Sequence, residues 1–168
     1  MKVVYSEDQL QHDVEDGAWM GEPEPYHERP ERVTEIIDAL RSSEFSEFVQ
    51  PGEHGLDPLR RVHSDAYLQF LQTLWQQSRD AGERRDALFP SCYAPHGMEI
   101  RQPASVDGLL GYFSFDTSAP ITADSWVAAK ASANTVLTAQ GAIASGERTA
   151  FALCRPPGHH AGRDYCGG

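Results

Sequence analysis

A long helix with almost no charge, followed at once by an apolar strand, constrains the fold of this chain most strongly. Residues 123–146 are rich in alanine and serine, and their pattern predicts a helix that is capped near Thr122 and runs to Gly146. Such small side chains suit close packing against a sheet. The apolar segment Thr149–Cys154 then has the composition of a buried strand in a parallel sheet. This succession predicts an α/β fold, in which ligands bind beyond the carboxyl ends of the strands.

Three further segments agree with that class. Residues 2–5 are predicted to form a short buried strand. One helix is expected from Pro30, a residue suited to the first helical turn, and another from Ser64, a residue suited to capping. Apolar residues recur at helical spacing in both helices, at Val33, Ile36, Ile37 and Leu40 and at Tyr67, Leu68, Leu71, Leu74 and Trp75.

The segments between these elements are predicted to be irregular. Residues 6–28 are acidic and residues 79–108 are charged, and neither has a helical period. Long loops of this kind are uncommon in compact domains, and they indicate a functional or interface role. Residues 45–58 are expected to form a connector that packs three side chains into the core, those of Phe45, Phe48 and Val49.

The chain of 168 residues has a net charge of −11, which disfavours binding to nucleic-acid phosphates. The negative charge is explained by solubility alone, and it would also favour the binding of a cationic small molecule. The amino-terminal segment lacks the apolar run of a signal peptide, and no segment approaches a membrane span. The three cysteines form no paired framework. We therefore expect a cytoplasmic protein without a nucleic-acid or membrane partner.

The closing segment CRPPGHHAGRDYCGG places two adjacent histidines after a stiff turn. Pro156 and Pro157 restrict the backbone, and Gly158 permits a conformation or a close approach that a side chain would block. Imidazoles exchange protons near neutral pH, so His159 and His160 are candidates for an acid and a base. They are also explained as loop residues without a function, whereas a shared metal site is disfavoured because neighbouring residues rarely point at one ion. The residues alone leave the first two interpretations open.

Five segments, in this order along the chain, resemble one enzyme family. RPPGHHAG, at residues 155–162, is similar to the tandem-histidine motif of the zinc-dependent histone deacetylase superfamily, in the form found in bacterial acetylpolyamine amidohydrolases and class II deacetylases. YHERPER, at 26–32, and VHSDAYL, at 62–68, resemble two earlier segments of that family. GYFSFDTSAPIT, at 111–122, and the starting MKVVYSEDQ resemble the acetylpolyamine amidohydrolase branch in particular.

The resemblance implies an arginase/deacetylase-like α/β fold with a mainly parallel sheet flanked by helices. It also implies a deacetylase that removes acetyl groups from acetylated polyamines or acetyl-lysine-like amides at a single zinc ion. By the resemblance, His160 is the general base that takes the proton of the attacking water. His159 is its electrostatic or acid partner.

The resemblance gives roles to four more residues. Gly168 falls beside the acetyl-lysine channel, and Trp19 falls at the channel mouth, where it is also explained as part of a dimer interface. Asp107 or Asp116 would attract the distant ammonium of an acetylated polyamine, although each is also explained as a solvated or capping carboxylate. Members of the branch pack their long loops across a homodimer, so a homodimer is expected of the complete enzyme.

The resemblance ends before the zinc ligands of the family, an Asp-x-His and a later Asp that follow the tandem histidines. The other histidines are scattered and lack metal-ligand spacing, so we assign no metal ligand within the chain. Residues 1–168 are therefore expected to be the amino-terminal portion of a single deacetylase domain, present without the rest and inactive alone. The alternative is an inert remnant that acts at most as an association module. A parallel sheet halted midway would leave an unpaired edge and an uncovered apolar face. An arginase-like ureohydrolase is disfavoured because its clustered Asp and His motifs are missing.

Overall fold

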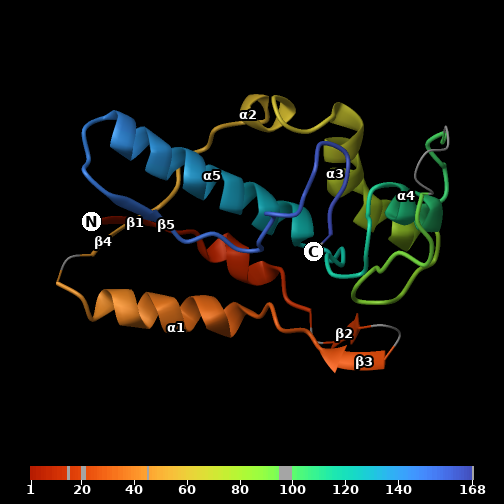
Figure 1. Ribbon diagram of the computed structural model, residues 1–168. Helices are drawn as coiled ribbons and strands as arrows, with labels where there is room; N and C mark the ends of the chain where they lie inside the picture. Colours follow the sequence, from red (N-terminus) through yellow and green to blue (C-terminus); the bar gives the residue numbers. More distant parts are fainter. Residues whose placement is uncertain (15, 20–21, 45, 95–99, 168) are drawn as a thin grey trace. The chain divides into compact units, whose positions relative to one another are not determined.

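The computed structural model describes residues 1–14, 16–19, 22–44, 46–94 and 100–167, and it divides into two compact units (Figure 1). Unit 1 comprises Met1–Asp13, His27–Pro58 and Asp124–Pro157. Unit 2 comprises Val14–Tyr26, Leu59–Ala123 and Gly158–Gly168. Each unit is assembled from segments that lie far apart in the sequence, and each has its own buried core.

A three-stranded parallel sheet forms the centre of unit 1. Its order is β4–β1–β5, with bounds Glu47–Val49, Lys2–Val4 and Ala150–Ala152. Val3 pairs with Phe48 on one side and with Phe151 on the other, so these three side chains share one face of the sheet. Val3 and Val4 are both buried, as expected for the predicted amino-terminal strand. The sheet confirms the predicted parallel pairing.

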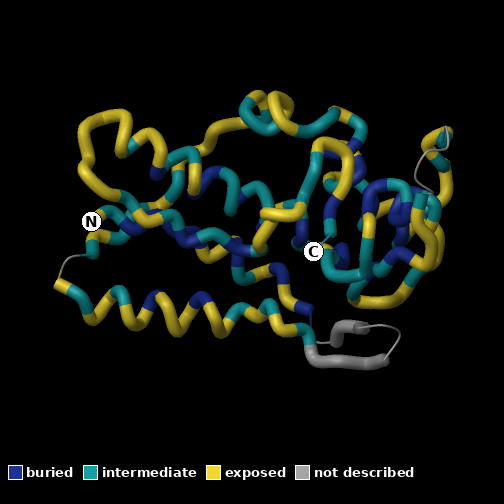
Figure 2. The backbone as a smooth tube through the Cα atoms, in the orientation of Figure 1, coloured by how far each residue is buried: buried dark blue, intermediate teal, exposed yellow. Residues whose placement is uncertain are grey.

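Helices flank both faces of this sheet (Figure 1), with α1 (Pro30–Arg41) on one face and α5 (Ser125–Ala144) on the other. α1 begins at Pro30, as predicted. Val33 and Ile37 are buried on one flank of α1 and most of the helix is exposed (Figure 2), as expected of an amphipathic helix. The predicted apolar stripe is only partly confirmed, because Leu40 is half-buried and Ile36 is 41% exposed. The apolar cluster under α1 consists of Val33, Ile37, Tyr5, Leu153, Leu10 and Phe48.

α5 packs closely against β1, β5 and the short 3-10 helix η1 (Glu7–Gln11). Its buried side chains are small ones, among them Ala128, Ala131 and Ala139, which confirms the expected close packing on a sheet. The residue that precedes the helix is Asp124, not Thr122, and the last helical residue is Ala144, not Gly146.

Buried polar groups join η1 to α5. Gln9 Nε2 donates to Thr135 Oγ1 at 3.0 Å, and both residues are fully buried. His12 Nδ1 lies 3.0 Å from Ser125 Oγ. Burial, together with the nearby Arg155 cation, lowers the pKa of His12 from 6.5 to about 4.

Unit 2 is built around α3 (Asp65–Asp80) and α4 (Val106–Tyr112). The predicted cap of α3 is confirmed, because Ser64 Oγ accepts a hydrogen bond from the Tyr67 backbone N–H at 3.2 Å. Phe70 and Phe113 bring their ring centroids to 4.8 Å in the centre of the core. The buried core residues are Tyr67, Phe70, Leu74, Leu88, Leu109, Leu110, Phe113, Ile121 and Cys166.

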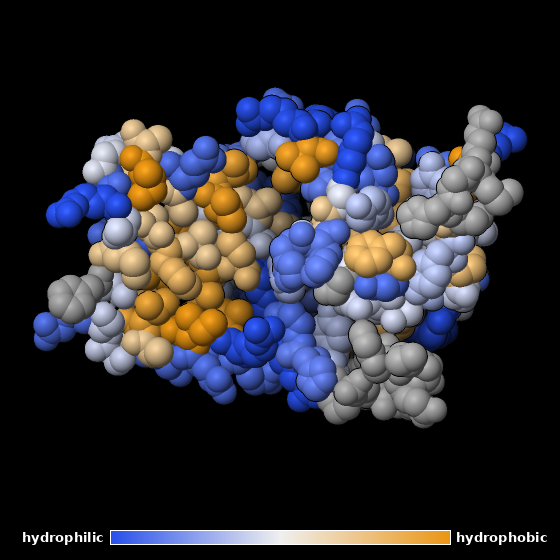
Figure 3. All heavy atoms as spheres, viewed as in Figure 1, coloured by the Kyte–Doolittle hydropathy of each residue, from blue (hydrophilic) through white to orange (hydrophobic). Residues whose placement is uncertain are grey.

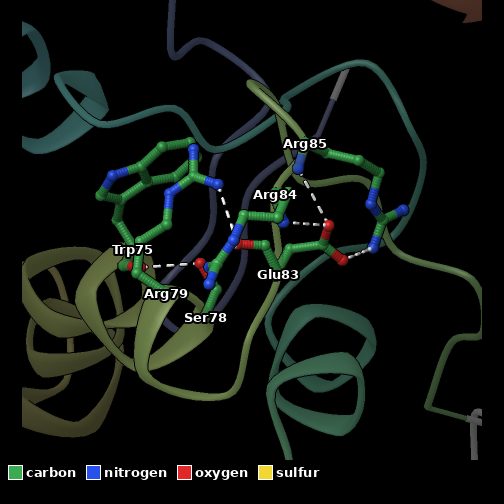
Figure 4. Close-up of polar contacts among 6 residues, drawn as sticks. All are labelled: Trp75, Ser78, Arg79, Glu83, Arg84 and Arg85. Atoms are coloured by element: carbon green, nitrogen blue, oxygen red, sulfur yellow. Dashed lines mark hydrogen bonds and ion pairs between the residues drawn. The ribbon is translucent and has the colours of Figure 1, made fainter.

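The segment after α3 is held by the polar contacts in Figure 4. The Glu83 carboxylate accepts hydrogen bonds from the backbone N–H groups of Arg84 and Arg85, and from the Arg85 guanidinium at 2.6 Å. The hydrogen bond from the Arg85 side chain is the main cause that lowers the pKa of Glu83 to about 2. The Arg79 guanidinium lies 4.1 Å from the centroid of the Trp75 ring and donates to the Glu83 carbonyl oxygen.

The structure corrects the segments that were predicted to be irregular. Residues 6–28 contain η1 and an antiparallel hairpin of β2 (Asp16–Trp19) and β3 (Glu22–Pro25). The connector at 45–58 contains β4 and the start of α2 (Asp57–Arg60), and residues 79–108 contain the start of α4. These elements are short, and they depend on pairing and packing with residues distant in the sequence. For this reason no local periodicity marks them in the sequence.

Two predictions about apolar side chains have different outcomes. Phe48 and Val49 are half-buried, and Phe48 packs against the cluster under α1, as expected, whereas Phe45 lies outside the described residues. β5 is shorter than the predicted strand at 149–154, and Phe151 at its centre is 38% exposed. The expected burial of this strand is therefore wrong for the described chain, because β5 lies at an edge of the sheet. In the described part of the chain, no helix combines the length and the apolar character needed to cross a bilayer.

Candidate active site

The closing segment brings the two predicted catalytic histidines into contact. The ring centroids of His159 and His160 are 4.2 Å apart, and their planes are inclined by 50°. Both residues are exposed to solvent. Two imidazoles at this separation can divide an acid role and a base role between them.

The closing segment needs a glycine at position 162, where a side chain would not fit, and not at position 158 as predicted. A Cβ atom on Gly158 would meet no atom within 4 Å, and its φ angle is not positive. The expectation of a glycine-dependent conformation or close approach at Gly158 is therefore wrong for the described chain. At Gly162, in contrast, an added Cβ would overlap the ring of Tyr165, and the Gly162 N–H donates to the Tyr165 carbonyl at 2.9 Å.

Within unit 1, Arg155 fixes the start of the motif. Its side chain is 1% exposed, and its Nε lies 3.1 Å from Glu28 Oε1. Nη1 donates to the Gln9 carbonyl at 2.6 Å, Nη2 donates to the Glu28 carbonyl at 3.3 Å, and the Arg155 backbone N–H donates to Gln9 Oε1. Burial raises the pKa of Glu28, and the Arg155 guanidinium opposes this rise. A fork of charge-assisted hydrogen bonds thus ties Arg155, three residues beyond the end of β5, to two distant segments.

Within unit 2, His63 fixes the end of the motif. His63 Nδ1 lies 2.8 Å from the Gly162 carbonyl oxygen, and the Ser64 N–H donates to the Arg163 carbonyl at 3.2 Å. Because a carbonyl oxygen only accepts, we assign the proton of this contact to Nδ1. The backbone N–H of Cys166 donates to the Phe113 carbonyl at 2.9 Å.

These contacts join segments that the sequence resemblance singled out separately. Glu28 belongs to YHERPER, His63 to VHSDAYL and Phe113 to GYFSFDTSAPIT, and each contacts the closing segment. Sequence reasoning assigned no partner to Glu28, Arg155 or His63. The sequence signal for this ion pair was the presence of opposite charges in two of the motifs, Glu28 in YHERPER and Arg155 in RPPGHHAG.

The four residues that were predicted to contact the substrate belong to unit 2, as do the two histidines. Trp19 is the last residue of β2, and its side chain lies outside the described part, as does all of Gly168. Asp107 is exposed in the first turn of α4. Asp116 Oδ1 accepts from the Ser118 N–H at 2.9 Å, which is the contact of a turn-capping carboxylate.

The described residues do not fit a zinc ion. Among them, no group of three or more His, Cys, Asp or Glu side chains is placed to hold a metal ion. Structural and catalytic zinc sites need at least three such ligands from the protein.

Comparisons with known proteins identify the class to which this fold and this motif belong. Residues 26–168 match the histone deacetylase domain, so the chain belongs to the histone deacetylase family. Over 168 residues it is 40% identical to acetylpolyamine amidohydrolase 2 of Pseudomonas aeruginosa, covering 100% of this chain and 48% of that protein. Over 175 residues it is 41% identical to acetylpolyamine amidohydrolase 1 of the same organism, covering 100% of this chain and 49% of that protein.

A solved structure shows the same fold. The crystal structure of acetylpolyamine aminohydrolase from Burkholderia pseudomallei matches with a TM-score of 0.89 at 29% sequence identity. The match covers 100% of this chain and 48% of that one. This likeness confirms the predicted arginase/deacetylase-like α/β fold. The chain spans about half the length of the relatives that it matches.

Proposed function

We propose that this chain supplies the proton-transfer part of an amidohydrolase site that deacetylates acetylated polyamines or acetyl-lysine-like amides. One observation carries the proposal: the two exposed imidazoles of the family motif lie 4.2 Å apart. The anchors at Arg155 and Gly162 support it, because contacts in both units hold the backbone on either side of the pair.

In the proposed reaction, a water oxygen adds to the amide carbonyl carbon, and the carbon–nitrogen bond then breaks to give acetic acid and the amine, which leave as acetate and an ammonium ion after the acid gives up its proton to the amine. His160 takes the proton of the attacking water as the new bond forms. His159 stabilises the charge of the tetrahedral intermediate and gives a proton to the departing nitrogen. Transfer of a proton from His160 to His159 then restores the pair.

We include zinc in the proposal for the complete site, where it would polarise the carbonyl group. The described residues do not fit the ion, so its ligands would come from polypeptide outside them. For this reason we expect residues 1–168 to be inactive alone. A cytoplasmic location and a homodimer of the complete enzyme are parts of the same proposal.

The proposed substrates are cationic, and the net charge of −11 supports this choice. Asp107 and Asp116 would attract the distant ammonium, and Trp19 and Gly168 would line the channel. In an active fusion protein, Asp107→Asn or Asp116→Asn should then raise KM for acetylputrescine and leave kcat nearly unchanged. KM for a neutral acetamide should not change.

The test of the proposed function is a single-chain fusion. Residues 1–168 are joined to the part of P. aeruginosa acetylpolyamine amidohydrolase 2 that follows its match to this chain. Zinc-loaded fusion protein should release acetate from acetylputrescine, and His160→Ala should lower kcat by about 100-fold or more, the scale of general acid–base catalysis. Full activity in His160→Ala, with the fold retained by circular dichroism, would refute the role of the pair. If the fusion does not fold, residues 154–168 replace the matched segment of the relative, and the same variant is assayed there.

A further inference from the structure

The closing segment and the segment that leads to Asp116 are joined by a parallel β-bridge in unit 2. The bridge pairs Ser114 with Cys166. The Cys166 N–H donates to the Phe113 carbonyl at 2.9 Å, and the Phe115 N–H donates to the Cys166 carbonyl at 3.1 Å. Backbone hydrogen bonds on either side of Ser114 thus fix the register between the two segments.

The side chain of Cys166 reinforces this bridge from the interior. Its Sγ lies 3.4 Å from the Phe113 carbonyl oxygen and 3.5 Å from Ser114 Oγ, and Cys166 and Ser114 are both buried. The Tyr67 hydroxyl donates a further hydrogen bond to this sulfur. Burial is the main cause that raises the pKa of the Cys166 thiol, and the Asp116 carboxylate is close enough to add to the rise. The thiol therefore keeps its proton, which it can donate to the neighbouring segment.

The ring of Phe115 strengthens the same pairing from the more exposed side. A Cβ atom on Gly167 would overlap this ring, and the Gly167 φ angle of +151° is one that residues with side chains rarely adopt. The Tyr165 ring packs against the Phe115 ring edge to face, with a centroid separation of 5.6 Å. Tyr165 also lies against Gly162, where an added Cβ would overlap its ring. The histidine segment is thus fastened to the residue that precedes Asp116.

These contacts are made within unit 2, which also contains the histidine pair. The apolar atoms that gather in Figure 3 lie instead over α5 and β5 of unit 1. The Asp116 carboxylate is oriented as well, because its Oδ1 accepts from the Ser118 N–H at 2.9 Å. An oriented carboxylate on a fixed backbone lies at a set distance from the histidine segment. A set distance between two binding groups selects substrates by their length.

We propose that the pairing made by Ser114, Phe115 and Cys166 determines the length of the substrate. The substrate class is the monoacetylated linear diamine with one preferred number of methylene groups between the amide nitrogen and the ammonium. The acetamide lies at the histidine pair, and the ammonium lies at Asp116. Ser114, Phe115 and Cys166 act by holding the backbone, and they are therefore positioning residues. The inference rests on the proposed function, from which it takes the two ends of the substrate.

The test uses the zinc-loaded fusion protein and monoacetylated diamines with three, four and five methylene groups. The ratio of kcat/KM between two substrates in one preparation does not depend on the fraction of folded enzyme. The unmodified fusion should prefer one length over its neighbours by about tenfold, the lower end of the discrimination that one methylene group gives. Cys166→Ala and Phe115→Ala should each reduce this preference to about threefold or less.

Two further variants serve as controls. Cys166→Ser retains a donor to the Phe113 carbonyl and should restore the length preference. Cys154→Ala removes a half-buried thiol of unit 1, which lies 3.7 Å from the Ser132 carbonyl, and should leave the preference unchanged. An equal fall in Cys154→Ala and Cys166→Ala would overturn the proposal. So would an unmodified fusion that is active without any length preference.

A double-mutant cycle separates positioning from a general structural loss. In Asp116→Asn the ammonium loses its carboxylate, so the length preference should fall. Cys166→Ala should then have no additional effect on the preference, because it acts only through the place of Asp116. Effects of the two substitutions that simply add would overturn the proposal.

Positioning and chemistry fail in distinguishable ways. A fusion that releases acetate with a preference unchanged in Cys166→Ala and Phe115→Ala would refute the positioning alone. For a fusion that binds the diamines without releasing acetate, isothermal titration calorimetry gives the ratio of dissociation constants. A ratio that Cys166→Ala shifts would then support the positioning and refute the proposed chemistry alone. A folded fusion that binds none of the three diamines would overturn both. If the fusion does not fold, residues 111–122 and 155–168 replace the matched segments of the P. aeruginosa relative, and the same variants are assayed there.

Discussion

Glu28 and Arg155, 127 residues apart in the sequence, form an ion pair in the interior of unit 1, with Nε of the arginine 3.1 Å from Oε1 of the glutamate. The arginine side chain is almost completely withdrawn from water. Removal of either partner would leave the other charge in a site of low polarity, which is costly. This pair therefore stabilises the fold and positions the segment that leads to the histidines.

Arg155→Ala should lower the free energy of unfolding by about 3–5 kcal/mol, because it leaves Glu28 buried without its cation and two carbonyl oxygens without their donor. Urea denaturation followed by circular dichroism measures the change. Glu147→Ala is the control, since it removes an exposed ion pair with Lys2, at 3.1 Å, and should cost less than about 1 kcal/mol. Similar losses in the two variants would contradict the role given to the buried pair.

His12 should make the stability of unit 1 depend on pH. Burial holds its pKa at about 4 in the folded chain, against 6.5 for an ordinary histidine, so the unfolded chain binds the proton first as the pH falls. The free energy of unfolding should therefore decrease between pH 6.5 and pH 4, by a total of about 3 kcal/mol from this residue.

Urea titrations at a series of pH values in this window measure the effect. His12→Gln should flatten the profile, whereas His54→Gln, which changes an exposed histidine, should preserve its slope. An unchanged slope in His12→Gln would show that other groups cause the dependence.

Two helical glycines should respond in opposite ways to substitution by alanine. A Cβ on Gly111 of α4 would overlap the carbonyl group of Cys92, which belongs to the backbone and cannot rotate aside. Gly111→Ala should therefore destabilise the protein by about 1–3 kcal/mol, as overpacking does. Gly141 of α5 has no atom within 4 Å of such a Cβ, and Gly141→Ala should stabilise by up to about 1 kcal/mol through its better helix propensity. Thermal unfolding of the two variants and the unmodified chain shows whether each substitution raises or lowers the stability.

Residues 1–168 alone should release no acetate from acetylputrescine or from an acetyl-lysine peptide above the level of a His159→Ala, His160→Ala control. The physical reason is that the described residues offer no set of ligands for the metal that would activate water and amide. Equilibrium dialysis should likewise show no stoichiometric zinc. Acetate release that depends on the histidine pair would contradict this prediction.

Sequence reasoning succeeded where a local pattern decides the structure. Ser64 caps α3, Pro30 opens α1, and the alanine-rich segment packs as α5 on a parallel sheet, because each outcome follows from residues close together in the chain. β4 was missed because three residues carry no periodicity, and Phe48 is held in place by pairing with Val3. The β2–β3 hairpin was missed because its prolines argue against strands in the centre of a sheet, although a two-stranded ribbon tolerates them.

The same distinction applies to the candidate site. The adjacency of His159 and His160 in sequence made their contact predictable, whereas the attachment of Arg155 to Glu28 depends on two distant segments folding together. The sequence singled out Gly158, which follows two prolines, whereas in the structure it is Gly162 that the ring of Tyr165 approaches. Close approaches of this kind arise only from the packed structure.

The contact between His63 and the Gly162 carbonyl joins two residues that lie 99 positions apart in the sequence. Gly162 is two residues beyond His160, so loss of the imidazole would release the backbone next to the histidine pair without any change in the closing segment itself. A residue outside the tandem-histidine motif thus helps to determine where that motif lies.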